Sequence, residues 1–308
     1  MRAVSPPDTK TRRDWLAAAL LVGTVLTLGF NWPLLALGLR QVSPLWLGSL
    51  RLLGATAVIF LIASASGRLK APPRSDRAVI ASVAFGRLII VMVLVFMALR
   101  LVPAGRSSVL VWTSSLWTVP LAATFLGERM TRRRWQGLAA GIAGMVILVE
   151  PWQSDLRPSV LLGYGLLLVA AVAQAATAVH VRAHSWTATP LELLPWQLLT
   201  AVIPLTTVTF ALEGFPPIDW TLGLAAIVAY QGVLATGYAT WAQLTVLRRL
   251  PAVTTNLTLM MVPVIGLLSS ALVLGELLTF STLLGAGLIA LGVLTGVGIE
   301  PVETPPLR

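Results

Sequence analysis

The residues of this chain that could do chemistry are single polar side chains set inside long apolar stretches. Asn31, Arg87, Gln174 and Asn256 each stand in such a stretch. Polar groups there cost free energy in hydrocarbon, so they usually face the protein interior or a water-filled cavity. The pattern favours reversible binding of a polar or charged solute over covalent catalysis.

Residue sets with catalytic spacing are missing from the sequence. The absence of cysteine excludes thiol chemistry, disulfides and cysteine-based metal sites. The two histidines, His180 and His184, are one helical turn apart but lack the Glu-x-x-His context of a metal site. No carboxylate pair falls in the middle of an apolar stretch, and no Gly-x-x-x-x-Gly-Lys-[Ser/Thr] nucleotide loop occurs. We therefore expect neither an enzyme nor a bound cofactor or metal.

The elements that carry these residues must be membrane-spanning helices. The chain is 56% hydrophobic and only 11% charged, with a mean hydropathy of +0.85, whereas soluble domains carry about 25% charged residues. About 20 apolar residues suffice to cross a bilayer as a helix. Continuous apolar runs, without the alternation of a β-barrel, predict ten spans: 15–39, 45–65, 78–99, 104–126, 134–150, 159–181, 190–212, 220–246, 252–274 and 278–298.

The positive charges support this span count and set the orientation. With the N-terminus inside, sixteen of the 22 Lys and Arg residues fall on the inner side and four on the outer side. The net charge of +10 therefore sets topology, and no basic patch interleaved with aromatic residues points to nucleic acid. We expect cytoplasmic tails at 1–14 and 299–308.

The two halves of the chain, 15–150 and 151–298, contain an internal repeat. At an offset of 148 residues, Pro-Ala precedes spans 4 and 9, Gly-Glu ends both, and Thr, Gly and Gly follow at identical spacing. The offset covers five helices, an odd number, so the second repeat must lie inverted in the membrane. Inverted repeats are typical of secondary transporters, which bind substrate near the midplane between the halves.

The candidate substrate-binding residues are polar and aromatic side chains within the spans. Trp112 and Ser115 are three residues apart on span 4 and share a helix face, as do Tyr238 and Trp241 on span 8. An indole beside a hydroxyl suits a ligand with an apolar body and a polar head. The alternative for each is ordinary packing. The full set is Asn31, Arg87, Trp112, Ser115, Gln174, Tyr238, Trp241 and Asn256.

Two arginines within spans leave two interpretations open. Arg87 lies about ten residues into span 3, where it either attracts a substrate carboxylate or snorkels or bonds helix-end carbonyls. Arg51 is closer to the outer surface, and we expect it to snorkel. Further residues have expected structural or gating roles, among them a proline that frees a backbone carbonyl for a substrate or an Asn side chain. This set is Pro33, Arg51, Glu128, Pro263 and Glu276.

The stretches PAGRSSVL…FLGERMT and PAVTTNLT…VLGELLT, with Asn31 to Pro33 and Arg51, resemble the drug/metabolite transporter superfamily, and within it the EamA-type exporters. The resemblance covers residues 15–298 and implies a basket of ten helices that exports metabolites such as amino acids, or drugs. Many members have a proline in the middle of both span 4 and span 9. Here Pro263 holds the span 9 place, but Ser115 holds the span 4 place.

The sequence thus predicts an all-α membrane protein of two inverted five-helix repeats. We expect secondary export of amino acids or related amphipathic compounds by alternating access across the inner membrane. A drug efflux carrier and a channel-like facilitator are the alternatives. The expected partners are a small-molecule substrate and the lipid bilayer, not nucleic acid, and the protein is expected to be a monomer or a homodimer.

Overall fold

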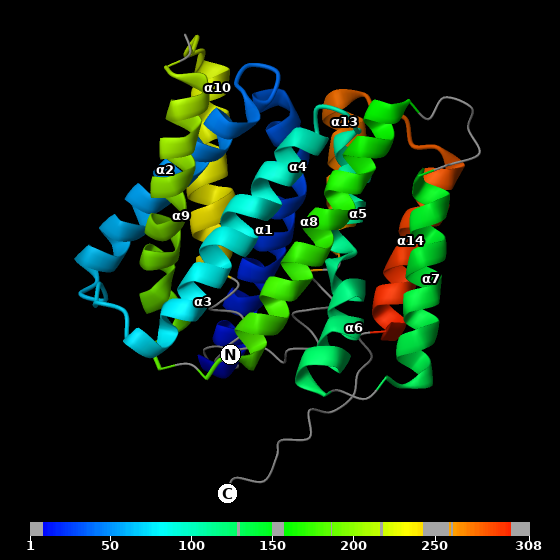
Figure 1. Cartoon of the computed structure of the whole chain (residues 1–308), viewed down its shortest axis with the longest axis horizontal. Helices are drawn as coiled ribbons and strands as arrows, with labels where there is room; N and C mark the ends of the chain where they lie inside the picture. Colours follow the sequence, from blue (N-terminus) through cyan, green and yellow to red (C-terminus); the bar gives the residue numbers. More distant parts are fainter. Residues whose placement is uncertain are drawn as a thin grey trace, which may run out of the picture.

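The computed structural model describes residues 9–127, 130–149, 157–185, 187–215, 218–242, 259 and 261–296, and every regular element in these ranges is a helix. The first half contains α1 (Thr9–Gly38), α2 (Pro44–Ala65), η1 (Arg74–Asp76), α3 (Arg77–Ala81), η2 (Ser82–Val91), α4 (Met92–Ala98), α5 (Ala104–Trp112), α6 (Ser114–Leu126) and α7 (Arg132–Val149). The second half contains α8 (Pro158–Ala183), α9 (Pro190–Glu213), α10 (Leu222–Ala229), η3 (Tyr230–Tyr238), α13 (Met261–Leu274) and α14 (Phe280–Gly296). Figure 1 shows the longer helices running between the same two ends of the molecule.

Within the described ranges, seven helical stretches are long and apolar enough to cross a membrane. Several consist of consecutive elements, such as α3–η2–α4 and α5–α6. The remaining apolar helices fall short for identifiable reasons. The 18 residues of α7 include three arginines, and the described parts of α13 and α14 have 14 and 17 residues.

Most helix bounds lie within a few residues of the predicted spans, but α1 does not start at Trp15. It begins at Thr9, so the end of the expected N-terminal tail is helical. The reason is local: no proline or glycine stands between Thr9 and Trp15, and Lys and Arg are good helix formers. Span 4 also differs from a continuous helix. It breaks at Thr113, where the backbone N–H bonds the carbonyl of Leu110, three residues back.

Helix packing follows the repeat. α1 packs on α13, and their counterparts 148 residues away, α8 and α6, pack on each other. α2 packs on its own counterpart α9, and α7 on its counterpart α14. Figure 1 shows these two last pairs at opposite edges of the molecule, with α1 and α8 between them. These four contacts are the ones expected from a two-fold relation between the halves.

Glycines of the repeat explain the close packing of α7 and α14. A Cβ added at Gly144 would lie 2.7 Å from the carbonyl oxygen of Gly285, and one at Gly292 would lie 2.6 Å from that of Gly137. Only glycine permits such backbone approach, a common device between membrane helices. Because the earlier glycine of each helix meets the later glycine of the other, the two helices run antiparallel.

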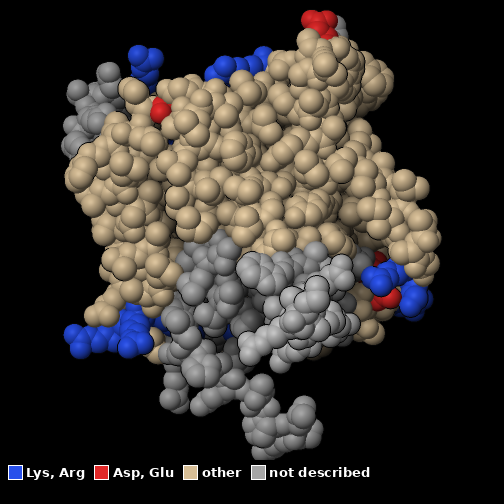
Figure 2. Space-filling model, turned by 180° about the vertical axis from the view of Figure 1, so that it is seen from behind, with Lys and Arg blue, Asp and Glu red and all other residues tan. Residues whose placement is uncertain are grey.

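The molecular surface is apolar between two charged ends. Leu61, Phe125, Leu212 and Leu272 each keep 70% or more of their area exposed. On the face shown in Figure 2, Lys and Arg lie along the top and bottom edges, and the broad band between them carries almost no charge. An apolar belt this large requires lipid rather than water as its neighbour.

Candidate functional site

Two π-helices occupy equivalent positions in the two repeats. η2 begins at Ser82 and η3 at Tyr230, 148 residues later, and both lie in the middle of a longer helical stretch. π-helical turns are rare and are frequently found at functional sites. These two elements carry Arg87 and the polar residues Gln231 and Thr236. The repeat therefore places its two irregular helices where the candidate binding residues lie.

Arg51 is the centre of a polar cluster, which we call the Arg51 cluster: Asn31, Arg51, Gln231 and Thr236. The Arg51 Nε donates to the Thr236 hydroxyl at 2.9 Å, and its Nη1 donates to the Gln231 side-chain oxygen at 2.9 Å. Gln231 is fully buried. The expectation that Arg51 snorkels is wrong, because acceptors at its own depth bond the guanidinium inside the bundle.

Asn31 contributes a free acceptor to this cluster. Its backbone oxygen accepts from the Gln231 amide at 3.5 Å, but its side-chain oxygen Oδ1 is buried without a hydrogen-bond partner among the described residues. An unpaired buried polar atom costs about 1–3 kcal/mol. The position is thus suited to accept a hydrogen bond from a donor that arrives from outside the protein.

Arg87 lies near the Arg51 cluster but stays accessible. It is exposed, and its charge is close enough to Arg51 for the two to repel each other. The exposed Phe85 lies two residues earlier, about half a turn away in a π-helix, so Arg87 points away from that lipid-facing side. The twelve acidic residues of the chain all lie at or beyond the ends of the predicted spans. Arg51 and Arg87 therefore share a region of the spans in which the sequence places no carboxylate.

Trp112 and Ser115 share a face, as the spacing predicts, and the structure brings Pro263 to them. The three line a cavity of about 40 Å³ with apolar residues of α13 and α14. That space suits one or two waters, not a metabolite. Gln174 lies on the neighbouring α8, where its amide donates to the Ser114 hydroxyl at 3.0 Å. In this conformation these residues pack spans 4, 6 and 9 together.

The two tyrosines of span 8 contact α1. Tyr230 donates to the carbonyl oxygen of Thr27 at 2.7 Å, and Tyr238 donates to that of Leu20 at 3.4 Å. The Tyr238 and Trp241 rings are neighbours, with centroids 6.3 Å apart, and Trp241 is 40% exposed. Tyr238 thus anchors η3 to α1, and Trp241 is the member of the pair that remains accessible.

Pro33 leaves a backbone carbonyl without its helical donor, and a side chain of another helix donates a hydrogen bond to it instead. A proline in a helix leaves the carbonyl four residues earlier, here that of Gly29, without its N–H donor. The hydroxyl of Ser269 on α13 donates to the Gly29 oxygen at 3.3 Å. The freed carbonyl is therefore used in helix packing, rather than by a substrate or by Asn31.

Glu276 caps a helix of the other repeat. Its two carboxylate oxygens accept from the backbone N–H groups of Ala104 and Gly105, the first residues of α5. The preceding Gly275 has a φ of 70°, and its counterpart Gly127 has a φ of 68°, so the Gly of both Gly-Glu pairs takes the left-handed conformation that favours glycine. Glu128 and Asn256 lie outside the described residues.

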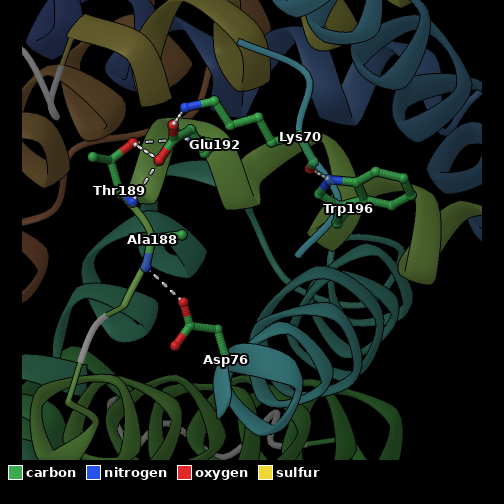
Figure 3. A network of polar contacts seen from close by, with 6 residues as sticks. All are labelled: Lys70, Asp76, Ala188, Thr189, Glu192 and Trp196. Atoms are coloured by element: carbon green, nitrogen blue, oxygen red, sulfur yellow. Dashed lines mark hydrogen bonds and ion pairs between the residues drawn. The ribbon is translucent and has the colours of Figure 1, made fainter. Parts of the chain in front are cut away.

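At the end of the molecule where α2 joins α3, two loops are bound together (Figure 3). Asp76 is buried and accepts from the backbone N–H of Ala188 at 2.8 Å and from that of Thr187, and it lies 2.9 Å from His184. Lys70 lies 3.2 Å from Glu192 and accepts from the Trp196 indole through its backbone oxygen. We call this network the loop clasp, and it joins the α2–α3 and α8–α9 connections.

The residues that sequence reasoning missed are partners rather than ligands: Gln231, Thr236, Ser269 and Asp76. A signal existed for the first two, since an arginine inside a span needs acceptors at its own depth. No signal identified Ser269, which is one of several serines and threonines on span 9.

Comparison with known proteins identifies the family. The model of the EamA-like transporter family matches residues 15–150 and again residues 161–296. A probable amino-acid metabolite efflux pump of Salmonella typhimurium is 30% identical over 93% of this chain and 95% of its own length. The uncharacterized transporter YoaV of Bacillus subtilis is 25% identical over 89% of this chain and 94% of its own. A solved crystal structure shares the fold with a TM-score of 0.61, at 21% identity, over 90% of this chain and 94% of that one. With two copies of the domain covering most of its length, this chain belongs to the EamA-like transporter family, whose members are multi-pass membrane proteins.

Proposed function

We propose that this protein exports amino acids or related amphipathic metabolites across the inner membrane by alternating access. Ten spans, arranged as two inverted five-helix repeats, would move against each other around a site between them. The antiparallel contact of α7 with α14 and the equivalent positions of η2 and η3 support this arrangement. The cation distribution supports cytoplasmic termini.

The observation that carries the substrate class is the pair Arg51 and Arg87 with no acid at their depth. Arg51 is held by Gln231 and Thr236, whereas Arg87 is accessible. A substrate carboxylate would lower the repulsion between the two guanidinium groups and gain charge-assisted hydrogen bonds from Arg87. The free oxygen of Asn31 would accept from a substrate ammonium. The Salmonella relative, named as a probable amino-acid metabolite efflux pump, supports the same class.

The test is transport in proteoliposomes loaded with a panel of radiolabelled amino acids. We expect saturable efflux of one class, lost in Arg87→Gln and reduced in Trp241→Ala. Arg157→Gln is the matched control, because Arg157 lies at the start of α8 outside the central region. If no amino acid moves while a cationic drug does, the substrate class is wrong and drug efflux is the function. Flux that never saturates would instead establish a passive facilitator.

A further inference from the structure

A second cavity lies at the end of the molecule that the proposed orientation places outside. It has a volume of about 410 Å³ and opens where α1 and α13 end and α5 begins. Its charged lining residues are Arg40, Arg100 and Glu276, and Leu39, Leu99 and Leu274 form apolar walls. The helices that meet here belong to spans 1, 3, 4 and 9. The cavity is large enough to enclose an amino-acid-sized ligand.

The charges of this cavity are arranged for a ligand with both signs of charge. Arg40 and Arg100 are exposed, and their side chains make no hydrogen bond or ion pair within the described part of the chain. Glu276 is held in place by the N–H groups of Ala104 and Gly105, one on each carboxylate oxygen. Each oxygen keeps further lone-pair capacity, so the carboxylate can still accept from an ammonium.

Topology does not explain the presence of Arg100. Outer loops of membrane proteins are depleted in Lys and Arg, yet the proposed orientation places Arg100 in one. Arg100 stands three residues before Pro103-Ala104, and Arg248 stands three residues before Pro251-Ala252 at the equivalent position of the other repeat. In inverted repeats, equivalent positions lie at opposite faces, and an orientation signal would appear at only one of them. The arginine is therefore repeated in the sequence where orientation does not require it, and this favours a role for Arg100 in the cavity.

We propose that this outer cavity is an exit-side site for the zwitterionic head of an α-amino acid. Arg40 and Arg100 receive the carboxylate, Glu276 receives the ammonium, and the three leucines contact the aliphatic side chain. The choice of an amino acid rests on the proposed function. Occupancy of the cavity does not, because it can be measured without transport.

The cysteine-free sequence makes a direct test available. In a Leu101→Cys variant the only thiol would line the cavity, and in Ser159→Cys it would lie on the exposed start of α8 as a control. The rate of labelling by a membrane-impermeant thiol reagent is measured on purified protein in nanodiscs, with and without L-leucine. We expect leucine to slow labelling of Leu101→Cys and leave Ser159→Cys unchanged.

The ligand chemistry is read from analogues and charge variants. In the Leu101→Cys background we add Arg40→Gln and Arg100→Gln, and we expect the leucine concentration that halves the labelling rate to rise by at least about tenfold. With the two arginines intact, 4-methylpentanoate, which lacks the ammonium, and isoamylamine, which lacks the carboxylate, should each require at least about ten times the concentration of leucine. Equal protection by 4-methylpentanoate would overturn the role of Glu276. Protection by phosphatidylglycerol in place of leucine would reassign the cavity to an anionic lipid headgroup, and no protection by any ligand would refute the site.

The two proposals fail separately. The labelling experiment on Leu101→Cys is repeated with Arg87→Gln added, a change that is expected to abolish binding at the central site of Arg51 and Arg87. Persisting protection supports an independent outer site, and its loss refutes that independence. If wild-type protein transports leucine while Leu101→Cys is never protected, the outer site is wrong and the proposed function stands.

Discussion

The carboxylate of Glu276 accepts a hydrogen bond from the backbone N–H of Ala104 at 2.6 Å, although 172 residues separate the two in sequence. This bond joins the Gly-Glu pair of the second repeat to the Pro-Ala pair of the first. The two motifs that define the repeat are therefore contact partners, each at the end of a helix whose backbone groups need satisfying. The sequence positions of the two motifs are therefore constrained by the contact that they make in the folded protein.

Removing this cap is expected to destabilise the fold. Glu276→Ala leaves the N–H groups of Ala104 and Gly105 without their acceptor, at a cost of about 1–3 kcal/mol. Thermal unfolding in detergent should show a lowered melting temperature. Asp219→Ala is the control, because Asp219 is exposed. A Glu276→Ala protein as stable as wild type would show that water replaces the cap.

Two substitutions in the Arg51 cluster should distinguish its effect on stability from its effect on substrate binding. Gln231→Leu removes the acceptor for the Arg51 Nη1 and is expected to lower stability by about 2–3 kcal/mol. Gln231→Glu loses the long amide bond to the Asn31 backbone oxygen but keeps the acceptor for Arg51 and adds a negative charge beside it, so the protein should be close to wild type in stability. The same charge neutralises Arg51 and should abolish transport of a carboxylate substrate. Full transport by Gln231→Glu would exclude this region as the site of anion binding.

The contact between α7 and α14 tolerates no added methyl group. Gly144→Ala places a Cβ 2.7 Å from the Gly285 oxygen and is expected to separate the helices and sharply reduce the yield of folded protein. Gly287→Ala, on α14 itself, meets nothing within 4 Å and should be neutral or stabilising by about 0.5–1 kcal/mol. The amount of monodisperse protein in size-exclusion chromatography is compared between the two variants. Equal amounts would contradict the close backbone approach of α7 and α14.

Ser269 and Pro33 should be energetically coupled. Ser269→Ala leaves the Gly29 carbonyl without a donor and is expected to cost about 0.6–1.7 kcal/mol. In a Pro33→Ala background the helix supplies its own N–H to that carbonyl, so the same substitution should cost less. A double-mutant cycle on unfolding free energies measures the difference. Additive effects would mean that the hydroxyl does not satisfy the freed carbonyl.

In the loop clasp, buried Asp76 should contribute more to stability than the exposed ion pair of Lys70 with Glu192. Asp76→Ala leaves the N–H groups of Thr187 and Ala188 unpaired and is expected to loosen the α8–α9 connection, measured as faster hydrogen exchange there. Lys70→Ala removes a side chain that is 71% exposed, and such pairs contribute about 0–1 kcal/mol. Equal exchange in both variants would reverse this ranking.

Local patterns of the sequence predicted the positions of most described helices and located the repeat. Apolar run length predicted segments such as Pro44–Ala65 and Ala104–Leu126, and the repeated glycines fall where α7 meets α14. The polar contacts were not predictable in the same way. Arg51 and Gln231 are 180 positions apart, and their bond depends on how α2 packs on η3, which periodicity does not encode. The two π-helices were missed because apolar patterns assume a regular turn.

The reciprocal glycine contact also bears on the origin of the fold. Gly137 meets Gly292 while Gly144 meets Gly285, so each surface contributes the same pair of residues in opposite order. Such a self-complementary contact is what two copies of one chain form about a two-fold axis. A protein of half this length, ending in a single helix with these two glycines, could make the interface with a second copy of itself. Carrying both surfaces on one chain makes this contact intramolecular, so the two halves can differ at every position outside it.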